Sequence, residues 1–124
     1  GHALAARTWA LIEQDGAQRV AIESIRNPEE IRFLRSLPGW TLLIGLNASP
    51  EKRFRHMLAR AKPTDPQTWE EFLAVEGRDR GAGESALGQQ VDASLALADI
   101  VLQNNGTREE LESAVRALIT KHDL

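Results

Sequence analysis

A carboxylate and a guanidinium follow a short apolar run near the start of the chain. Residues 18–23 are predicted to form a strand, and residues 23–28 read Glu-Ser-Ile-Arg-Asn-Pro. The Asn-Pro pair is typical of a helix start, so Arg26 is expected beside free backbone N–H groups. A guanidinium at a helix N-terminus favours an anion, most simply a phosphate. We therefore predict a phosphate site at Arg26, with Glu23 holding the arginine or facing a metal-bound ligand. The alternative is that these two side chains only pair with each other.

A second group of arginines flanks a turn-rich segment in the middle of the chain. The segment Lys-Pro-Thr-Asp-Pro-Gln-Thr-Trp-Glu-Glu-Phe, residues 62–72, contains two prolines and is predicted to be structured. An excursion edged by arginines, at about residues 60–85, resembles a lid that closes over phosphates. The alternative is a solvated helical hairpin whose acids neutralise the arginines. The arginines are Arg53, Arg55, Arg60, Arg78 and Arg80, and the acids are Glu70, Glu71, Glu76 and Asp79.

Composition excludes several classes of protein. The 124 residues suffice for one domain, and a net charge of −3 argues against sequence-independent nucleic-acid binding. The chain has no cysteine, and its three histidines lie far apart in sequence, so no metal site is predicted. No apolar run approaches the ~20 residues of a membrane span. We expect a soluble, cytoplasmic protein.

The elements that would position these residues alternate between helix and strand. Strands are predicted near residues 18–23, 40–47 and 99–103, because apolar residues cluster there between turn signals. This alternation predicts an α/β fold with a short parallel sheet in a three-layer sandwich. Helices are predicted over residues 3–15, 28–37, 50–61, 68–79 and 86–98, and from residue 108 onward.

Four segments in this order resemble the later part of P-loop nucleotide kinases. They are IRNPEEIRFLR, LLIGLNASPEKRFRHMLAR, DPQTWEEFLAVEGRDRG and ALADIVLQNNGTREEL, and the resemblance covers roughly residues 4–118. The most similar members are dephospho-CoA-kinase-like and archaeal nucleotide-kinase-like proteins, and kinase-like domains fused to deoxycytidylate deaminases. The resemblance implies a single partial kinase-like domain over residues 1–124.

The resemblance also implies roles for individual residues. Arg26 would grip the phosphate of the acceptor nucleotide, and Arg60 would border the donor nucleotide. Arg78 or Arg80 would reach the donor phosphates from the lid. The turn Asn104-Asn105-Gly106 would lie against the donor base. The family's strand ends in Asp-Gly-Ile-Arg-Asn-Pro, whereas Glu23 and Ser24 stand at the first two of these positions here.

The phosphate-binding loop of such kinases has no counterpart in residues 1–124. That loop needs Gly-Lys-Ser/Thr after a strand, and no Gly-Lys pair occurs in this sequence. We therefore expect a kinase-like fold truncated at its N-terminus, with no catalytic residue of its own. ATP and magnesium would be used by a full-length parent that phosphorylates a nucleotide or dephospho-CoA. The alternative is a non-catalytic nucleotide-binding or regulatory module, fused to a deaminase-type domain in one version of this hypothesis.

The resemblance also predicts a gap in the sheet. In the kinase fold the P-loop strand lies between the strands that match residues 18–23 and 40–47. Without it each of these strands has an exposed edge, and exposed edges invite pairing. We expect the two strands to pair directly, or a second copy or a missing N-terminal segment to fill the gap, and we favour a homodimer.

Overall fold

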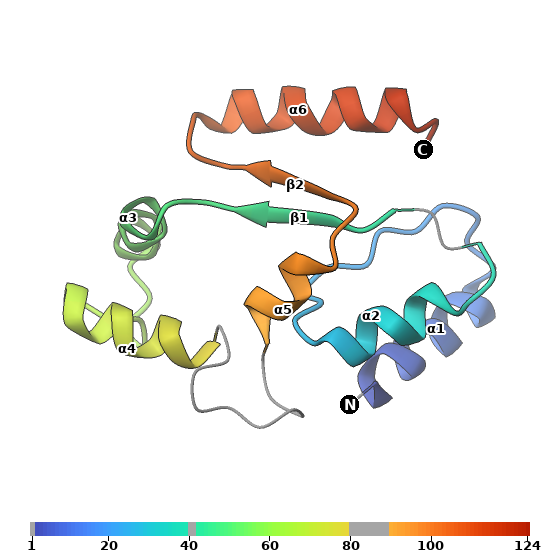
Figure 1. Ribbon diagram of the computed structural model, residues 1–124, viewed down its shortest axis with the longest axis horizontal. Coiled ribbons are helices and arrows are strands. Elements are labelled where there is room, and N and C mark those ends of the chain that lie inside the picture. The colour runs from blue at the N-terminus through green and yellow to red at the C-terminus, as the bar shows by residue number, and fades with distance from the viewer. Residues whose placement is uncertain (1, 40–41, 80–89) are drawn as a thin grey trace.

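Two parallel strands and six helices make up the part of the chain that the computed structural model describes, residues 2–39, 42–79 and 90–124 (Figure 1). An α/β fold with parallel pairing is thereby confirmed. The helices are α1 (Ala3–Asp15), α2 (Pro28–Arg35), α3 (Pro50–Arg60), α4 (Trp69–Asp79), α5 (Val91–Ala96) and α6 (Arg108–Lys121), and the strands are β1 (Ile44–Asn47) and β2 (Ile100–Gln103). Within these ranges no helix is long and apolar enough to cross a membrane.

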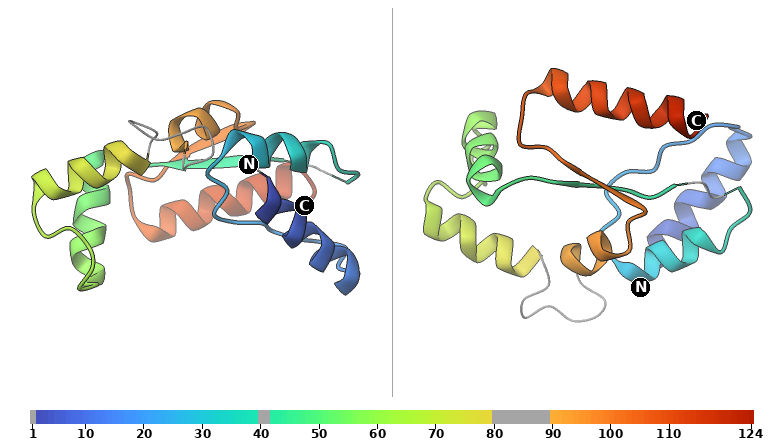
Figure 2. Two further views of the ribbon diagram at one scale, coloured as in Figure 1. Left: turned by 90° about the horizontal axis from the view of Figure 1, so that it is seen from below. Right: turned by 45° about the horizontal axis from the view of Figure 1, so that its top comes forward.

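The two strands run side by side in register, with Ile44 opposite Ile100 and Asn47 opposite Gln103. Helix α5 packs against one face of the pair, where a Cβ on Gly45 would lie 2.9 Å from Leu95 Cδ2. Helix α6 lies along the other face (Figure 2). Helices therefore flank both faces of the sheet, but they cover it incompletely, because Leu46 of β1 is 53% exposed and Val101 of β2 is 42% exposed.

The predicted strand at residues 18–23 is wrong, because residues 17–27 form no strand in the structure. Val20 remains 46% exposed, and Ser24 adopts a left-handed backbone conformation with φ of 65°. A strand forms only where a neighbouring strand satisfies its hydrogen bonds, and β1 pairs only with β2 among the described residues. Direct pairing of residues 18–23 with β1, one of the expected ways to close the gap, is therefore not what the structure shows.

Other boundaries differ less from the predictions. Strand β1 begins at Ile44 rather than at residue 40, with residues 40–41 outside the described part of the chain. The helix predicted over residues 86–98 is described only as Val91–Ala96, because residues 86–89 also lie outside that part.

Helix starts follow the predicted cap-proline pattern. Asn27 Oδ1 accepts a hydrogen bond from Glu29 N at 2.9 Å, and Ser49 Oγ accepts one from Lys52 N at 3.3 Å. Each of these caps precedes a proline in the first turn. Thr107 and Glu110 form a capping box at the start of α6. These local hydrogen bonds fix the starts of α3 and α6 within a few residues of the ends of β1 and β2.

Two small apolar clusters hold the helices together. Ile31 and Leu34 of α2 are each 1% exposed, and Ala5 of α1 is also buried. The second cluster joins α3 to α4: the Phe54 ring lies 5.3 Å from that of Phe72 and 5.6 Å from that of Trp69, measured between centroids. The described part of the predicted lid, α4 and the turn before it, therefore packs on α3 through this aromatic cluster.

Candidate functional site

The C-terminal ends of both strands meet at one edge of the sheet. Strand β1 ends at Asn47 and β2 at Gln103, and each strand leads within a few residues to a capped helix start. The two turns are tied together, because Asn104 N donates to Asn47 O at 2.6 Å and Ser49 N donates to Asn105 Oδ1 at 2.8 Å. In parallel α/β sheets this edge is where ligands bind.

An open pocket of about 450 Å³ lies at this edge, and we call it the edge pocket. It combines main chain from both turns with amide, guanidinium and carboxylate side chains, so it is polar enough to orient a charged ligand. Its lining residues are Asn47, Ala48, Ser49, Pro50, Arg53, Glu76, Gln103 and Asn105.

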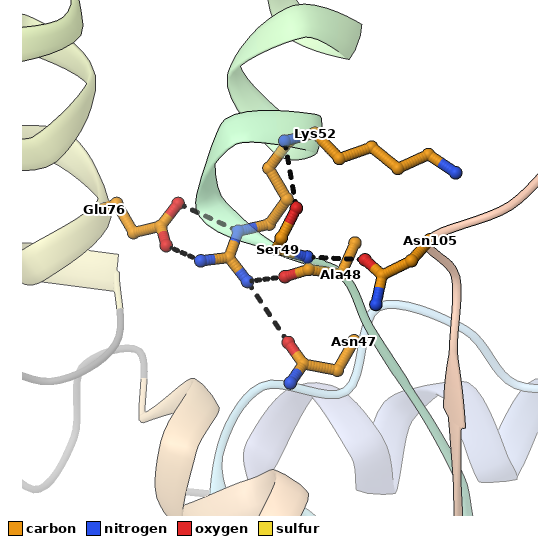
Figure 3. Close-up of polar contacts among 7 residues, drawn as sticks. Asn47, Ala48, Ser49, Lys52, Glu76 and Asn105 are labelled. Carbon is orange, nitrogen blue, oxygen red and sulfur yellow. Dashed lines mark hydrogen bonds and ion pairs between the residues drawn. The ribbon is translucent and has the colours of Figure 1, made fainter.

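Arg53 is the cation inside the edge pocket. Its Nη1 donates to Asn47 Oδ1 at 3.1 Å and to Ala48 O at 2.6 Å, which fixes the guanidinium at the end of β1. Its Nε donates to Glu76 Oε2 at 3.1 Å, and its Nη2 pairs with Glu76 Oε1 (Figure 3). The side chains of Arg53 and Glu76 are 25% and 16% exposed. The pair is therefore largely withdrawn from water, which strengthens its electrostatic interaction.

The predicted donor-base turn belongs to this edge. Asn104 and Asn105 make the two contacts to the end of β1 described above, and Gly106 O accepts a hydrogen bond from Lys52 Nζ. Lys52 stands in the first turn of α3, so a second cation lies near the turn. Asn105 therefore lines the edge pocket with Arg53, whereas Asn104 and Gly106 line a second, smaller pocket at the start of α6.

Arg60 lies at the far end of α3 from the edge pocket. Seven residues separate it from Arg53, a rise of about 10 Å along a helix. Its Nε and Nη2 donate to the two carboxylate oxygens of Asp65 at 2.7 and 2.9 Å. This hydrogen bonding lowers the pKa of Asp65 below its ordinary value of 3.8 and raises the pKa of Arg60. The structure therefore places Arg60 in an ion pair outside the pocket.

The remaining predicted residues lie elsewhere. Arg78 is exposed on α4, and Arg80 lies outside the described residues. Glu23 and Arg26 are exposed. Arg26 O accepts from Gln90 N at 2.7 Å, and Arg26 N donates to Glu30 Oε2 at 3.4 Å, so Arg26 lies between the starts of α2 and α5. Neither Glu23 nor Arg26 lines the edge pocket.

The hypothesis of a charge-laced hairpin finds partial support. Glu76 is one of the four acids predicted to neutralise the arginines, and it pairs with Arg53. Arg60 pairs instead with Asp65, which is not one of the four. Arg53 is predictable from the sequence only as one of the arginines that edge the lid, and its place in a pocket with Asn47 and Ser49 is not. The repeated cap-proline start after β1 was the available signal, since it puts the first turn of α3 at the strand end.

Within the described ranges, no group of three or more histidine, aspartate or glutamate side chains is placed so that it could hold a metal ion. The polar side chains of the edge pocket are the amides of Asn47, Gln103 and Asn105, the hydroxyl of Ser49, and the guanidinium of Arg53 paired with the carboxylate of Glu76. The polar groups that line the edge pocket can bind an anion or a polar ring through hydrogen bonds.

Comparison with known proteins finds similar sequences of greater length. The chain is 34% identical over 118 residues to a UPF0200 protein of Hyperthermus butylicus, covering 95% of the chain and 59% of the relative. It is 35% identical over 106 residues to a UPF0200 protein of Thermococcus kodakarensis, covering 84% of the chain and 54% of the relative. It is 30% identical over 117 residues to a UPF0200 protein of Thermoplasma acidophilum, covering 94% of the chain and 60% of the relative. The chain thus spans a little more than half the length of these relatives, whose names state no activity. No family model matches the chain, and no solved structure gives a significant match.

Proposed function

We propose that this chain carries the nucleotide-contacting part of a P-loop nucleotide-kinase-like domain. A longer protein with this domain would transfer a phosphoryl group from ATP to a nucleotide or to dephospho-CoA. The observation that carries the proposal is the convergence of both parallel strand ends on the edge pocket, which Arg53 and Asn105 both line. This is the position at which parallel α/β sheets bind nucleotides.

Each group in the pocket has a task in this proposal. The guanidinium of Arg53 supplies positive charge for phosphate oxygens inside the pocket, and the ammonium of Lys52 supplies it outside the pocket lining, beside Gly106. The amides of Gln103 and Asn105 supply donors and acceptors suited to a nucleobase. Arg26 remains the proposed contact of the acceptor phosphate, Arg60 a proposed neighbour of the donor nucleotide, and Arg78 or Arg80 a proposed contact of the donor phosphates. Magnesium and the P-loop lysine would come from a Gly-Lys-Ser/Thr segment, which residues 1–124 do not contain.

Backbone amide chemical shifts during a titration with ATP test this function. Binding at the edge pocket should shift the amide signals of Asn47, Ser49, Asn105 and Gly106 and leave those of α1 unchanged. Asn105→Ala should weaken binding several-fold, because it removes an amide from the pocket and the partner of Ser49 N. The matched control is Gln14→Ala, which removes an exposed amide from α1. Shifts confined to residues outside the pocket, or none at all, would refute the proposal.

The alternative function is a nucleotide-binding or regulatory module without catalysis, and the absence of Gly-Lys from residues 1–124 favours it for this polypeptide. We expect no ADP formation from ATP with any nucleoside monophosphate or with dephospho-CoA, because no lysine follows a strand in a glycine-rich turn. Stoichiometric ADP formation that is lost on Arg26→Ala would contradict this expectation.

A further inference from the structure

A carboxylate of the protein itself, that of Glu76, is already paired with Arg53, the cation of the edge pocket. Glu76 and Arg53 both line the pocket, and Glu76 pairs with the Nε and Nη2 side of the guanidinium. Carboxylates and phosphates bind this side of a guanidinium in the same two-point geometry. The carboxylate of Glu76 therefore stands where two oxygens of a phosphate would bind.

Arg53 does not depend on Glu76 for its position. Its Nη1 is held by Asn47 Oδ1 and Ala48 O, which both belong to the end of β1. Loss of the Glu76 contact would thus leave the guanidinium in the pocket with its outer side open to a ligand.

Glu76 also connects two parts of the fold. It lies on α4 one turn after Phe72, which is 2% exposed and packs against Phe54 of α3. Residues four apart share one face of a helix. Phe72 therefore attaches the N-terminal half of α4 to α3, and the ion pair of Glu76 with Arg53 attaches its C-terminal half. Release of the ion pair would loosen the C-terminal half of α4 and leave its N-terminal half packed on α3.

We infer that Glu76 is an internal competitor for the anion site, and that a phosphate-bearing ligand must displace it from Arg53 and thereby free the C-terminal half of α4. This inference rests on the proposed function, because it requires that the edge pocket binds phosphate. Phosphate binding is then coupled to the release of Glu76 from Arg53, and the coupling is reciprocal. Whatever detaches Glu76 strengthens phosphate binding, and bound phosphate favours the state in which the C-terminal half of α4 is detached.

Calorimetric titration with inorganic pyrophosphate at low salt tests the competition. Glu76→Gln removes the competing charge, keeps a hydrogen-bond acceptor and should bind pyrophosphate about five- to tenfold more tightly than the wild type. The matched control is Glu112→Gln, which removes one negative charge from an exposed pair with Arg108 on α6 and should bind as the wild type does. Arg53→Gln should lose binding with either residue at position 76.

Hydrogen exchange supplies a second readout that a simple change in net charge would not alter. Amides of Val75, Gly77 and Arg78 should exchange faster in Glu76→Gln, and also in the wild type saturated with pyrophosphate. Amides near Phe72 should stay protected in both. Glu76→Asp keeps the charge on a shorter side chain and should bind with intermediate affinity, which provides a test even if the glutamine variant folds poorly.

The outcomes separate this inference from the proposed function. If the wild type and Glu112→Gln bind pyrophosphate and Glu76→Gln binds no more tightly, the inference is wrong and the function stands. If binding tightens equally in Glu76→Gln and Glu112→Gln, the effect is one of net charge and the inference is again wrong. If no variant binds pyrophosphate or ATP, both are wrong.

Discussion

The carboxylate of Asp99 accepts a hydrogen bond from the backbone N–H of Leu43 at 2.7 Å, just before the two strands begin. The same carboxylate accepts from Arg35 Nη2 at 3.0 Å, and that nitrogen also donates to Leu97 O at 2.6 Å. One acidic side chain thus ties the end of α2 to the starts of β1 and β2. This arrangement holds the strands in the register that brings their far ends together at the edge pocket.

Replacing Asp99 with alanine should lower the free energy of unfolding by about 1–2 kcal/mol. The N–H of Leu43 and the guanidinium of Arg35 would lose an acceptor, and the cost stays at the low end because the Asp99 side chain is 40% exposed. Urea unfolding followed by circular dichroism measures the change. Glu112→Gln, in an exposed pair, should change the free energy by less than about 0.5 kcal/mol. An equal effect of the two substitutions would contradict this role for Asp99.

Two glycines should respond in opposite directions to substitution by alanine. A Cβ on Gly45 would lie 2.9 Å from Leu95 Cδ2 and 3.2 Å from Ala98 Cβ, so Gly45→Ala should destabilise the fold by about 1–2 kcal/mol. A Cβ on Gly77 would meet nothing within 4 Å inside α4, so Gly77→Ala should stabilise the fold by about 0.5–1 kcal/mol. Thermal unfolding of both variants measures the contrast. A stabilising Gly45→Ala would show that α5 does not pack closely on β1.

The ion pair between Arg60 and Asp65 should contribute to stability in a pH-dependent way. The folded-state pKa of Asp65 lies below its ordinary value of 3.8, because Arg60 donates two hydrogen bonds to the carboxylate. The stabilisation is therefore fully present above this ordinary value and is lost as pH falls through the lower, folded-state pKa. The difference in unfolding free energy between the wild type and Asp65→Asn should shrink over that acidic range in urea titrations. Arg60→Gln should abolish this dependence, and an unchanged difference down to the lowest pH would contradict the assignment.

Helix starts were predictable because their stabilising contacts are local. Asn27, Ser49 and Thr107 each accept a backbone N–H two or three residues along the chain, and a proline or an acid completes the signal. The strand expected at residues 18–23 depended instead on a neighbour. Its apolar residues fit a buried strand, but the described residues include no strand beside it, and the segment forms no strand.

The same distinction applies to the candidate site. The Asn104–Gly106 turn could be placed at the strand edge because it directly follows an apolar run. The contact between Arg53 and Glu76 spans 23 residues and depends on how α4 folds back on α3, which no local pattern fixes. The ion pair of Arg60 with Asp65 is local, since the two residues lie five positions apart, and Asp65 is not among the four acids predicted to neutralise the arginines.

The free edge of β1 gives the final prediction, which is self-association of the chain. Leu43 O and Asn47 O bond toward β2 and the residues that follow it, so the alternate residues Ile44 and Leu46 direct their backbone N–H and C=O groups to the opposite edge. No described strand pairs there, and the Leu46 side chain is 53% exposed. Residues 42–49 carry no charge, whereas natural edge strands are usually protected by charges, prolines or bulges.

A second copy can satisfy this edge by antiparallel pairing of β1 with its symmetry mate across a two-fold axis. The accessible surface of 8713 Å² exceeds the roughly 6,600 Å² typical of a compact monomer of this mass. The difference between these two surface areas is larger than the roughly 800 Å² that each partner buries in a protein–protein interface of standard size. Light scattering at high protein concentration should therefore give twice the chain mass of 13.7 kDa. Leu46→Lys should shift the mass to that of the monomer, and Leu73→Lys, at a 47% exposed position on α4, should not. A strictly monomeric wild type would show that β1 keeps its edge open in solution.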